Sequence, residues 1–312
     1  MCFNLFRLAS LSRILKTEPL ITPRETVTMN IRRIHQLIQT TAVTEGAGVT
    51  VHRSIGTPAL RQLDPFLMLD HFGSDQPEDY IAGFPDHPHR GFNTFTYMLD
   101  GHMLHQDSMG NRGDLKAGGA QWMKAASGVI HSEMPQQSAG LMRGFQLWIN
   151  LPASEKMSDP AYQEYSPEAI PVVSQPGCTV KVLLGEYAGA RGPIEDPATR
   201  VEYFDVTLAA GQTFNHACSA DSAFVYVFEG EAMLATFHLP RHTLAVLAAG
   251  DSVELNAGPA GARFILVSGH PIGEPVVQYG PFVMNTREEI EQAFADYRDN
   301  RLVQHKAVMH GR

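Results

Sequence analysis

Cysteine is scarce in this sequence. Its 312 residues include three cysteines, Cys2, Cys178 and Cys218, at wide spacing. An odd number of widely spaced thiols gives no disulfide framework and no cysteine-based zinc site. The scarcity fits a reducing compartment, so we expect a cytoplasmic protein.

Basic residues are outnumbered by acidic ones. Lys and Arg total 24 against 33 Asp and Glu, which gives a formal net charge of -9 at pH 7 with neutral histidine. Sequence-independent binding to nucleic acid requires clustered Lys and Arg that neutralise phosphates, and we find no block of like charge. We therefore expect no direct contact with nucleic acid. The composition, 44% hydrophobic and 18% charged, is that of a globular protein with one or two domains.

Long apolar runs are missing from the first 28 residues, because Arg7, Arg13 and Lys16 interrupt the apolar positions. A membrane span needs about 20 consecutive apolar residues, so we expect no membrane insertion. Residues 1–28 are interpreted as a leader that is disordered or not native, with Met29 as an alternative start of translation. A weak amphipathic helix or targeting segment stays open at this point.

Short strand-like segments make up most of the chain. Between about residues 45 and 150 they alternate with Gly, Pro, Asn and Asp, which is typical of an all-β sandwich or barrel. The segment 92–99 is followed by Asp100-Gly101, which predicts a tight hairpin turn. A second series runs from 178 to 268, with a turn expected at 229–231. Because the two halves repeat the same order of strands and turns, we predict two similar β-domains in tandem.

The remaining segments set the expected boundaries. Residues 153–177 contain Pro and Ser with weak periodicity, so we interpret them as a connection between a domain at 29–152 and another at 178–285. Thr286 and Glu289 form a capping-box pattern at the start of a helical period. We expect a C-terminal helix and tail at 286–312, packed on one of the β-domains.

Two short steps carry the chemistry. His87-Pro88-His89 and His131-Ser132-Glu133 each place two metal-binding side chains two residues apart, and such residues share one face of a strand. If the two strands pair, His87, His89, His131 and Glu133 converge on one point. Nitrogen and oxygen donors in this mix suit iron, copper, manganese or zinc. A closed structural zinc site is the less favoured alternative, because no thiolate is present.

Other histidines are given no metal role. His102 and His105 follow the Asp100-Gly101 turn and are interpreted as solvated loop residues, with a supporting role near the metal as the alternative. No ligand role is assigned to His71. His216 has no second donor at a two-residue step, so we expect the second domain to be free of metal.

A string of motifs resembles the pirin family of the cupin superfamily. The segments are Phe84-Pro85-Asp86-His87-Pro88-His89-Arg90-Gly91-Phe92, Gly119-Ala120-Gln121-Trp122-Met123, Gly128-Val129-Ile130-His131-Ser132-Glu133-Met134-Pro135 and Phe145-Gln146-Leu147-Trp148-Ile149-Asn150-Leu151. The resemblance runs from about residue 45 to the C-terminal helix. It implies two tandem cupin-type β-barrels, each a jelly-roll-like double-stranded β-helix, with one iron in the first and none in the second. The ligands it implies are His87, His89, His131 and Glu133.

The resemblance also implies an activity. Pirins are described as quercetin 2,3-dioxygenases, and the animal protein also as an iron-dependent transcriptional co-regulator. We therefore expect a chelating aromatic substrate and dioxygen, with Glu133 as the catalytic base, and Phe84 and Arg90 beside the pocket. The expected metal is Fe²⁺, and Mn, Cu, Ni, Co or Zn are alternatives. The alternative function is a redox-responsive regulator with a protein partner, and a monomer is expected.

One position departs from the pattern. Many pirins carry Glu four residues after the second histidine, and this chain has Asn93.

Overall fold

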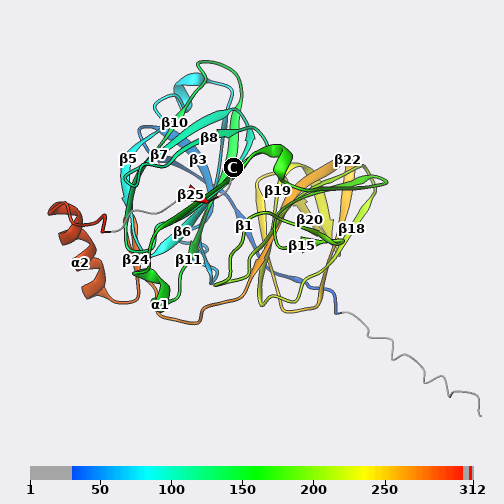
Figure 1. The fold of residues 1–312 in the computed structure, drawn as a ribbon. Coiled ribbons are helices and arrows are strands. Elements are labelled where there is room, and N and C mark those ends of the chain that lie inside the picture. The colour runs from blue at the N-terminus through cyan, green and yellow to red at the C-terminus, as the bar shows by residue number, and fades with distance from the viewer. Residues whose placement is uncertain (1–29, 305–308, 311–312) are drawn as a thin grey trace, which may run out of the picture.

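The computed structural model describes residues 30–304 and 309–310 (Figure 1). The leader expected at 1–28 lies outside the described residues. Within the described part, no helix is long and apolar enough to cross a bilayer. The expected all-β fold with two barrels side by side and one long helix near the C-terminus is confirmed.

The first barrel is built from two sheets whose neighbouring strands run antiparallel, apart from one parallel pair at an edge. Its eight-stranded sheet contains, in spatial order, β2 (Thr41–Glu45), β3 (Val49–Ile55), β4 (Phe66–Ser74), β11 (Met142–Asn150), β6 (Phe92–Asp100), β9 (Ala120–Lys124), β12 (Ala161–Tyr165) and β25 (Met309–His310). Its four-stranded sheet contains β5 (Phe84–His89), β10 (Val129–Pro135), β7 (His102–Asp107) and β8 (Arg112–Lys116).

The second barrel is one nine-stranded sheet. Its main path is β1 (Ile34–Gln39), β21 (Thr243–Leu247), β19 (Ser222–Leu234), β22 (Ser252–Gly269), β17 (Glu202–Leu208), β14 (Cys178–Leu184) and β13 (Val172–Gln175). β18 (Thr213–Ala217) and β20 (Phe237–Pro240) pair to the side of this path. Small elements complete the chain: β15 (Glu186–Tyr187), β16 (Ala190–Arg191), β23 (Val277–Tyr279), β24 (Phe282–Met284), α1 (Ala153–Lys156), α2 (Arg287–Arg298) and the 3₁₀ turns Pro77–Asp79 and Pro167–Ala169.

The first strand and the C-terminal segment of the described residues are exchanged between the barrels, which differs from the expected boundaries. Strand β1, expected in the first domain, pairs antiparallel with β21 of the second. The buried Arg32 guanidinium donates to the carbonyl oxygens of Cys218 and Ala248 in that barrel. Conversely, the segment that follows the second barrel returns to the first, where the Val283 amide donates to the Arg90 carbonyl at 3.0 Å.

Three further expectations need correction. The Asp100-Gly101 turn does not close a hairpin, because β6 pairs with β9 and β11 while β7 pairs with β8 and β10 in the other sheet. The turn expected at 229–231 is an irregularity inside the continuous strand β19, where the register shifts and Gly230 has φ +63°. The segment expected to connect the domains also contains β12 of the first barrel and β13 of the second.

The helix expected near the C-terminus is confirmed at Arg287–Arg298. The Thr286 side chain accepts from the Glu289 amide, and the Glu289 carboxylate accepts from the Thr286 amide. Ile290 and Ala293 are buried in a cluster with Phe282, Met284 and Leu302. The helix therefore packs on β24, which lies against the first barrel (Figure 1).

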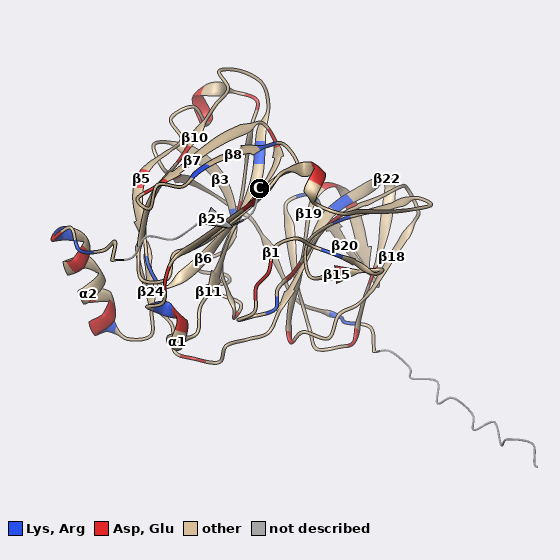
Figure 2. Cartoon of the chain, in the orientation of Figure 1, with Lys and Arg blue, Asp and Glu red and all other residues tan. Residues whose placement is uncertain are grey.

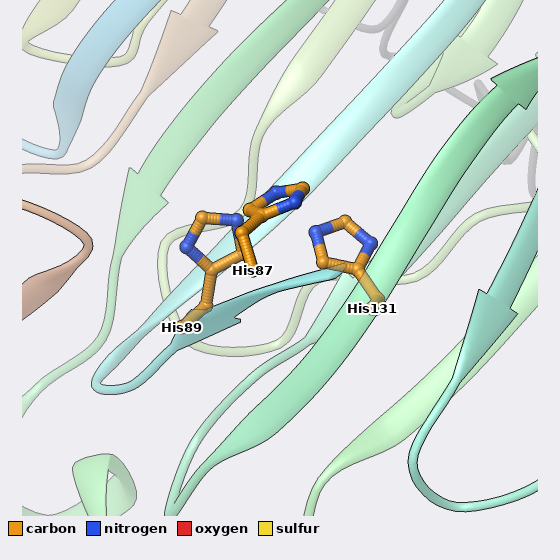
Figure 3. Close-up of side chains that lie close together, drawn as sticks. All are labelled: His87, His89 and His131. Atoms are coloured by element: carbon orange, nitrogen blue, oxygen red, sulfur yellow. The ribbon is translucent and has the colours of Figure 1, made fainter. Parts of the chain in front are cut away.

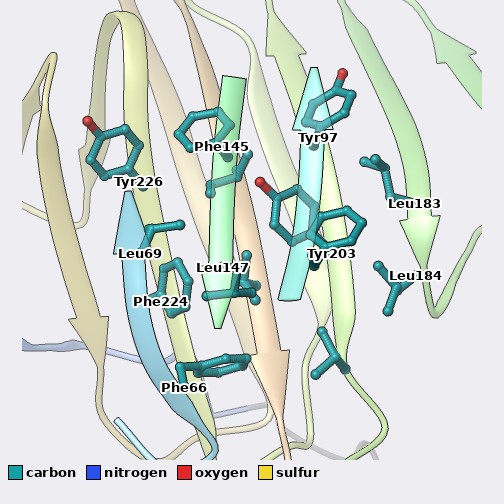
Figure 4. Close-up of a cluster of buried hydrophobic side chains, with 14 of the residues drawn as sticks. Phe66, Leu69, Tyr97, Phe145, Leu147, Leu183, Leu184, Tyr203, Phe224 and Tyr226 are labelled. Atoms are coloured by element: carbon teal, nitrogen blue, oxygen red, sulfur yellow. The ribbon is translucent and has the colours of Figure 1, made fainter. Parts of the chain in front are cut away.

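The largest apolar cluster lies between the barrels (Figure 4). Leu69, Phe145 and Leu147 of the first barrel meet Tyr203, Phe224, Tyr226 and other residues of the second. Strands alternate their side chains between two faces. On β11, Phe145 and Leu147 face this cluster, so Gln146 and Trp148 face the interior of the first barrel, where a cavity opens.

Charged residues are spread over both barrels. Figure 2 shows acidic and basic positions interspersed along the strands and loops, with both signs on α2.

Candidate metal centre

Strands β5 and β10 bring the two sequence steps together. They pair antiparallel, with His131 opposite His87 and Val129 opposite His89. The register shifts between His131 and Glu133, so that Glu133 lies opposite Phe84. The pairing on which the predicted convergence depended is therefore present.

The three imidazoles point toward one another (Figure 3). Their ring centroids are 4.3 Å apart for His87 and His131, 4.7 Å for His87 and His89, and 5.0 Å for His89 and His131. One ring nitrogen of each lies within 4.8 Å of the corresponding atoms of the others. His89 and His131 are buried, and His87 is half-buried at the edge of the cavity.

The hydrogen bonds of these rings fit a metal ion. Nδ1 of His87 lies 2.8 Å from the Pro85 carbonyl oxygen, and Nδ1 of His89 lies 3.5 Å from that of Pro281. The buried Nε2 atoms of His89 and His131 have no hydrogen-bond partner in the described structure. A buried imidazole nitrogen without a partner is costly unless something else binds it. Metal-binding histidines use one nitrogen for the ion and the other for an oriented partner, as here.

Burial favours the neutral form of the His89 and His131 rings. Burial, followed by the neighbouring imidazoles, lowers the pKa values of His89 and His131 well below the usual 6.5. Neutral imidazole is the form that binds a metal. The imidazoles of His89 and His131 therefore offer lone pairs to a cation instead of carrying positive charge.

Glu133 is buried and held by three side-chain donors. Gln121 Nε2 donates to Oε1 at 2.7 Å, Gln146 Nε2 donates to Oε2 at 2.9 Å, and the Thr96 hydroxyl donates to Oε1 at 3.2 Å. One carboxylate oxygen lies within 4.8 Å of ligand atoms of His131 and His105. The sequence reasoning missed these donors, because the three residues belong to strands of the other sheet.

His105 is not a solvated loop residue. It lies on β7, has 1% of its surface exposed, and places Nδ1 3.4 Å from Nδ1 of His131. Its Nε2 lies 3.3 Å from Asp107 Oδ2. His105-Gln106-Asp107 is itself a two-residue step, so the same signal that identified His87 and His89 was present here. His102 is also on β7, but it is paired with Asp114 near the surface.

A cavity of about 710 Å³ adjoins the centre. His87, His89 and Glu133 line it together with apolar side chains such as Phe72 and Trp148. Arg53 forms a two-bond ion pair with Asp70 in the same lining, at 2.8 and 2.6 Å. The cavity therefore combines an aromatic wall, a charged pair and the candidate ligands.

Of the two residues expected beside the pocket, one lies in the cavity lining and the other does not. Phe84 lines the cavity. Arg90 does not: it is buried with its side chain turned to the C-terminal segment, where it donates to Asp296 Oδ2 at 2.7 Å and to the Ser127 carbonyl oxygen at 2.6 Å. The expectation for Arg90 was wrong because the returning segment occupies that side of β5. Asn93 is buried on β6 and is not part of the cavity lining.

In the second barrel, His216 Nε2 lies 3.2 Å from Glu202 Oε2. A cluster of Val, Leu, Phe and Ala side chains fills that barrel, including Val182, Phe204 and Leu266. The ring of His216 packs against Tyr187 and Phe204 beside this cluster. Its contacts are those of a paired, packed histidine.

Comparisons with known proteins bear on the family and the fold of this chain. Residues 48–149 match the family model described as Pirin, and residues 203–303 match that of the Pirin C-terminal cupin domain. A pirin-like protein of Caulobacter vibrioides is 48% identical over 276 residues, covering 88% of this chain and 100% of the relative.

Two solved structures extend the comparison. The quercetin 2,3-dioxygenase of Acinetobacter baumannii is similar, with a TM-score of 0.81 and 32% identity over 87% of this chain and 98% of that one. The bacterial pirin YhhW of Escherichia coli, solved in complex with nickel(II), has a TM-score of 0.60 and 19% identity, covering 76% of this chain and 98% of that one. At that identity the likeness bears on the fold alone.

Proposed function

Because this chain belongs to the pirin family, whose two domains are cupin barrels, we propose that it is a metal-dependent dioxygenase that cleaves a flavonol such as quercetin. The observation that carries the proposal is the cluster of three histidines, two with buried unpartnered Nε2 atoms, beside Glu133 and a cavity of about 710 Å³. The similar Acinetobacter structure named as a quercetin 2,3-dioxygenase supports the reaction class.

The proposed centre uses His87, His89, His131 and Glu133 to hold Fe²⁺. The same nitrogen and oxygen donors accept Mn, Cu, Ni, Co or Zn. When bound, the ion supplies Lewis acidity toward the substrate's oxygen atoms and redox chemistry toward dioxygen. The overall reaction consumes dioxygen, opens the heterocycle and releases carbon monoxide.

The side chains of the cavity supply binding and proton transfer. Phe72, Phe84 and Trp148 form an aromatic wall suited to a flat polycyclic substrate. Glu133 is the proposed base that takes the proton of the flavonol hydroxyl, since its carboxylate borders the cavity. The donors Gln121, Gln146 and Thr96 fix the orientation of this carboxylate, so that it is in place before substrate enters.

The test is an assay of the iron-loaded protein with quercetin, in which oxygen is admitted and the flavonol absorption band and carbon monoxide are followed. We expect turnover by the natural chain. Glu133→Gln should keep most of its metal and lose turnover by about 100-fold or more, as expected for removal of a general base. Unchanged turnover in this variant would exclude Glu133 as the base.

A second candidate is a redox-responsive regulatory protein with a protein partner. One observation favours it: the segment that carries Pro281, the acceptor for His89, also carries Tyr279, which is 69% exposed. A change at the metal would thus be close to a surface aromatic group. Absence of flavonol cleavage with iron, manganese, copper, nickel and cobalt would favour this candidate over the enzyme.

A further inference from the structure

His131 differs from the other two histidines in the group that its second nitrogen meets. His87 and His89 direct Nδ1 toward backbone carbonyl oxygens, which can only accept a hydrogen bond. Nδ1 of His131 instead faces Nδ1 of another imidazole, that of His105, at 3.4 Å. Both rings are 1% exposed, so water does not replace either partner.

The chemistry of this contact assigns the protons. Two facing ring nitrogens make a hydrogen bond only if one carries the proton and the other does not. His131 needs a free lone pair on Nε2 to bind a metal, so its proton sits on Nδ1 and is donated to His105. His105 must then carry its own proton on Nε2, where Asp107 Oδ2 lies 3.3 Å away as the acceptor.

Hydrogen bonds hold the Asp107 carboxylate in position to accept from His105. Its side chain has no exposed surface. Oδ1 accepts from the backbone amides of Met109 and Asn111 at 2.9 and 3.0 Å, and Oδ2 accepts from Asn111 Nδ2 at 2.8 Å. Burial alone would raise the pKa of Asp107, but the hydrogen bonds from His105 and Asn111 outweigh it and lower the pKa below the usual value. The carboxylate therefore remains an acceptor.

A stacked ring fixes the plane of His105. The Tyr162 ring stacks on it, with centroids 4.6 Å apart and an interplanar angle of 27°. The Tyr162 hydroxyl lies 3.0 Å from Gln121 Oε1, and Gln121 is the residue that donates to Glu133. This group of buried side chains therefore contacts His131 through His105 and Glu133 through Gln121.

We propose that Asp107 and His105 form a proton-ordered relay that holds His131 in the tautomer with Nε2 directed into the centre. His105 and Asp107 are positioning residues in this assignment, not ligands. The proposal rests on the proposed metal centre and deepens it, because it names what orients one of its ligands. The rival arrangement makes His105 itself a ligand, since His105, His131 and Glu133 also have donor atoms within 4.8 Å of one another.

The first experiment reads the protons directly. We suggest two-bond ¹H–¹⁵N NMR of the full chain with ¹⁵N-labelled histidine, in the metal-free protein and after addition of zinc. The expected result is protonated Nδ1 on His131 and protonated Nε2 on His105 in both samples. Protonated Nδ1 on His105, or zinc bound by His105, would overturn the relay. Because the metal-free sample is read separately, failure to bind zinc would count against the proposed function and not against the relay.

The second experiment compares variants by their affinity for Co²⁺, measured by chelator competition and the visible spectrum. His105→Leu, which offers no acceptor, should weaken binding about 10–100-fold, and His105→Gln, whose amide oxygen accepts, should recover much of the loss. Asp107→Asn should weaken binding as well, because its amide can donate to His105 Nε2 and so favours the opposite tautomer.

The matched control is another His–Asp pair of the same sheet, His102 on β7 and Asp114 on β8, whose Nε2 and Oδ1 atoms lie 2.5 Å apart near the surface. Asp114→Asn should leave the affinity for Co²⁺ and the spectrum unchanged. Equal affinity of His105→Leu and the natural chain would overturn the proposal. So would two Co²⁺ ions per chain in the natural protein, with His105 required for the second. A loss of melting temperature without a change in affinity would assign His105 a packing role only.

Discussion

At the scale of single residues, Arg90 is a buried charge that follows a candidate ligand in the sequence but turns away from the candidate centre. Its guanidinium is 1% exposed and pairs with Asp296 of α2 at 2.7 Å. It also donates to the carbonyl oxygens of Ser127 and Leu302. Since Arg90 follows His89 directly, this pair attaches the helix to the strand that bears two of the candidate ligands.

We predict that Arg90→Met lowers the free energy of unfolding by about 3–5 kcal/mol, because it leaves the Asp296 carboxylate without its buried partner. Asp296→Asn should cost less, and the double variant should be less destabilised than the sum of the two. Urea unfolding at pH 7 measures all three. A loss below about 1 kcal/mol for Arg90→Met, with a raised KM for quercetin, would instead place Arg90 in substrate binding.

Residue-level prediction succeeded where two donors share one strand face. The steps at His87 and His89 and at His131 and Glu133 needed only the period of two, and the pairing of β5 with β10 brought them together. His105 was missed although it forms the same kind of step with Asp107. Its neighbours Gln106 and Ser108 are polar, and whether such a segment is loop or strand depends on pairing with β8 and β10, which the sequence does not display.

At the scale of elements, the segment β23–β24 acts as a brace for β5. Val283 donates its amide to the Arg90 carbonyl, and the Lys156 ammonium bridges the Gly91 and Val283 carbonyl oxygens at 2.7 and 3.0 Å. Pro281, two residues before Val283, faces Nδ1 of His89. The brace therefore reaches the candidate centre through one hydrogen bond.

Gly91 tests the brace. Its φ of +90° favours glycine, and a Cβ at this position would collide with the Val283 carbonyl oxygen. Gly91→Ala should destabilise the protein by about 1–3 kcal/mol beyond the backbone strain of a left-handed alanine, because β24 must move. It should also weaken metal binding, since the acceptor of His89 moves with the segment.

The matched control is Gly189→Ala, at φ +83° with no atom within 4 Å of the added Cβ. It should show the cost of backbone strain alone, about 1–2 kcal/mol, with unchanged affinity for metal. Chemical unfolding and Co²⁺ titration of both variants make the comparison. Equal losses of stability for the two variants would show that β24 adapts and that the brace is weak.

Elements were harder to predict than residues, for a physical reason. Asp100-Gly101 has the local chemistry of a hairpin turn, and Gly101 does take φ +92°, but the strands on either side continue into different sheets. Turn residues determine how the chain reverses locally. Which strand then pairs with which is decided by burial of the two faces of each strand across the whole barrel.

At the scale of the whole molecule, the two barrels are joined by exchanged segments and by a buried interface. β1 completes the sheet of the second barrel, and the C-terminal segment packs on the first. The sequence repeat predicted two β-domains, but the exchange could not be predicted, because the pattern of β1 is equally compatible with either sheet.

The interface also holds three histidines from both barrels. His52 and His71 belong to β3 and β4, and His242 precedes β21; the rings of His52 and His242 are 4.5 Å apart, and those of His71 and His242 are 5.4 Å apart. Burial first, and then neighbouring charges including Arg241, lowers all three pKa values: that of His71 well below 6.5 and that of His242 to about 4. Arg143 also faces His71, whose Nδ1 lies 3.1 Å from the Tyr226 hydroxyl.

These shifts predict acid instability with a definite sign. A histidine whose pKa is lowered by folding binds its proton more readily in the unfolded chain, whose pKa is about 6.5. The stabilising contribution of each neutral histidine is complete above about pH 6.5. For His242 it is lost as the pH falls toward 4, and for His71 the loss continues to lower pH. His242→Asn should reduce this loss, and asparagine tolerates the φ of +65° at this position.

The measurement is the difference in melting temperature between pH 7.5 and pH 5.0 for the metal-free protein and its variants. His89 and His131 also have lowered pKa values, but they are present in every sample, so their contribution cancels between variants. His35→Asn, at an exposed position of β1, should leave the difference as in the natural chain. If His242→Asn shows the same difference as His35→Asn, the buried imidazole of His242 is not a source of the acid sensitivity.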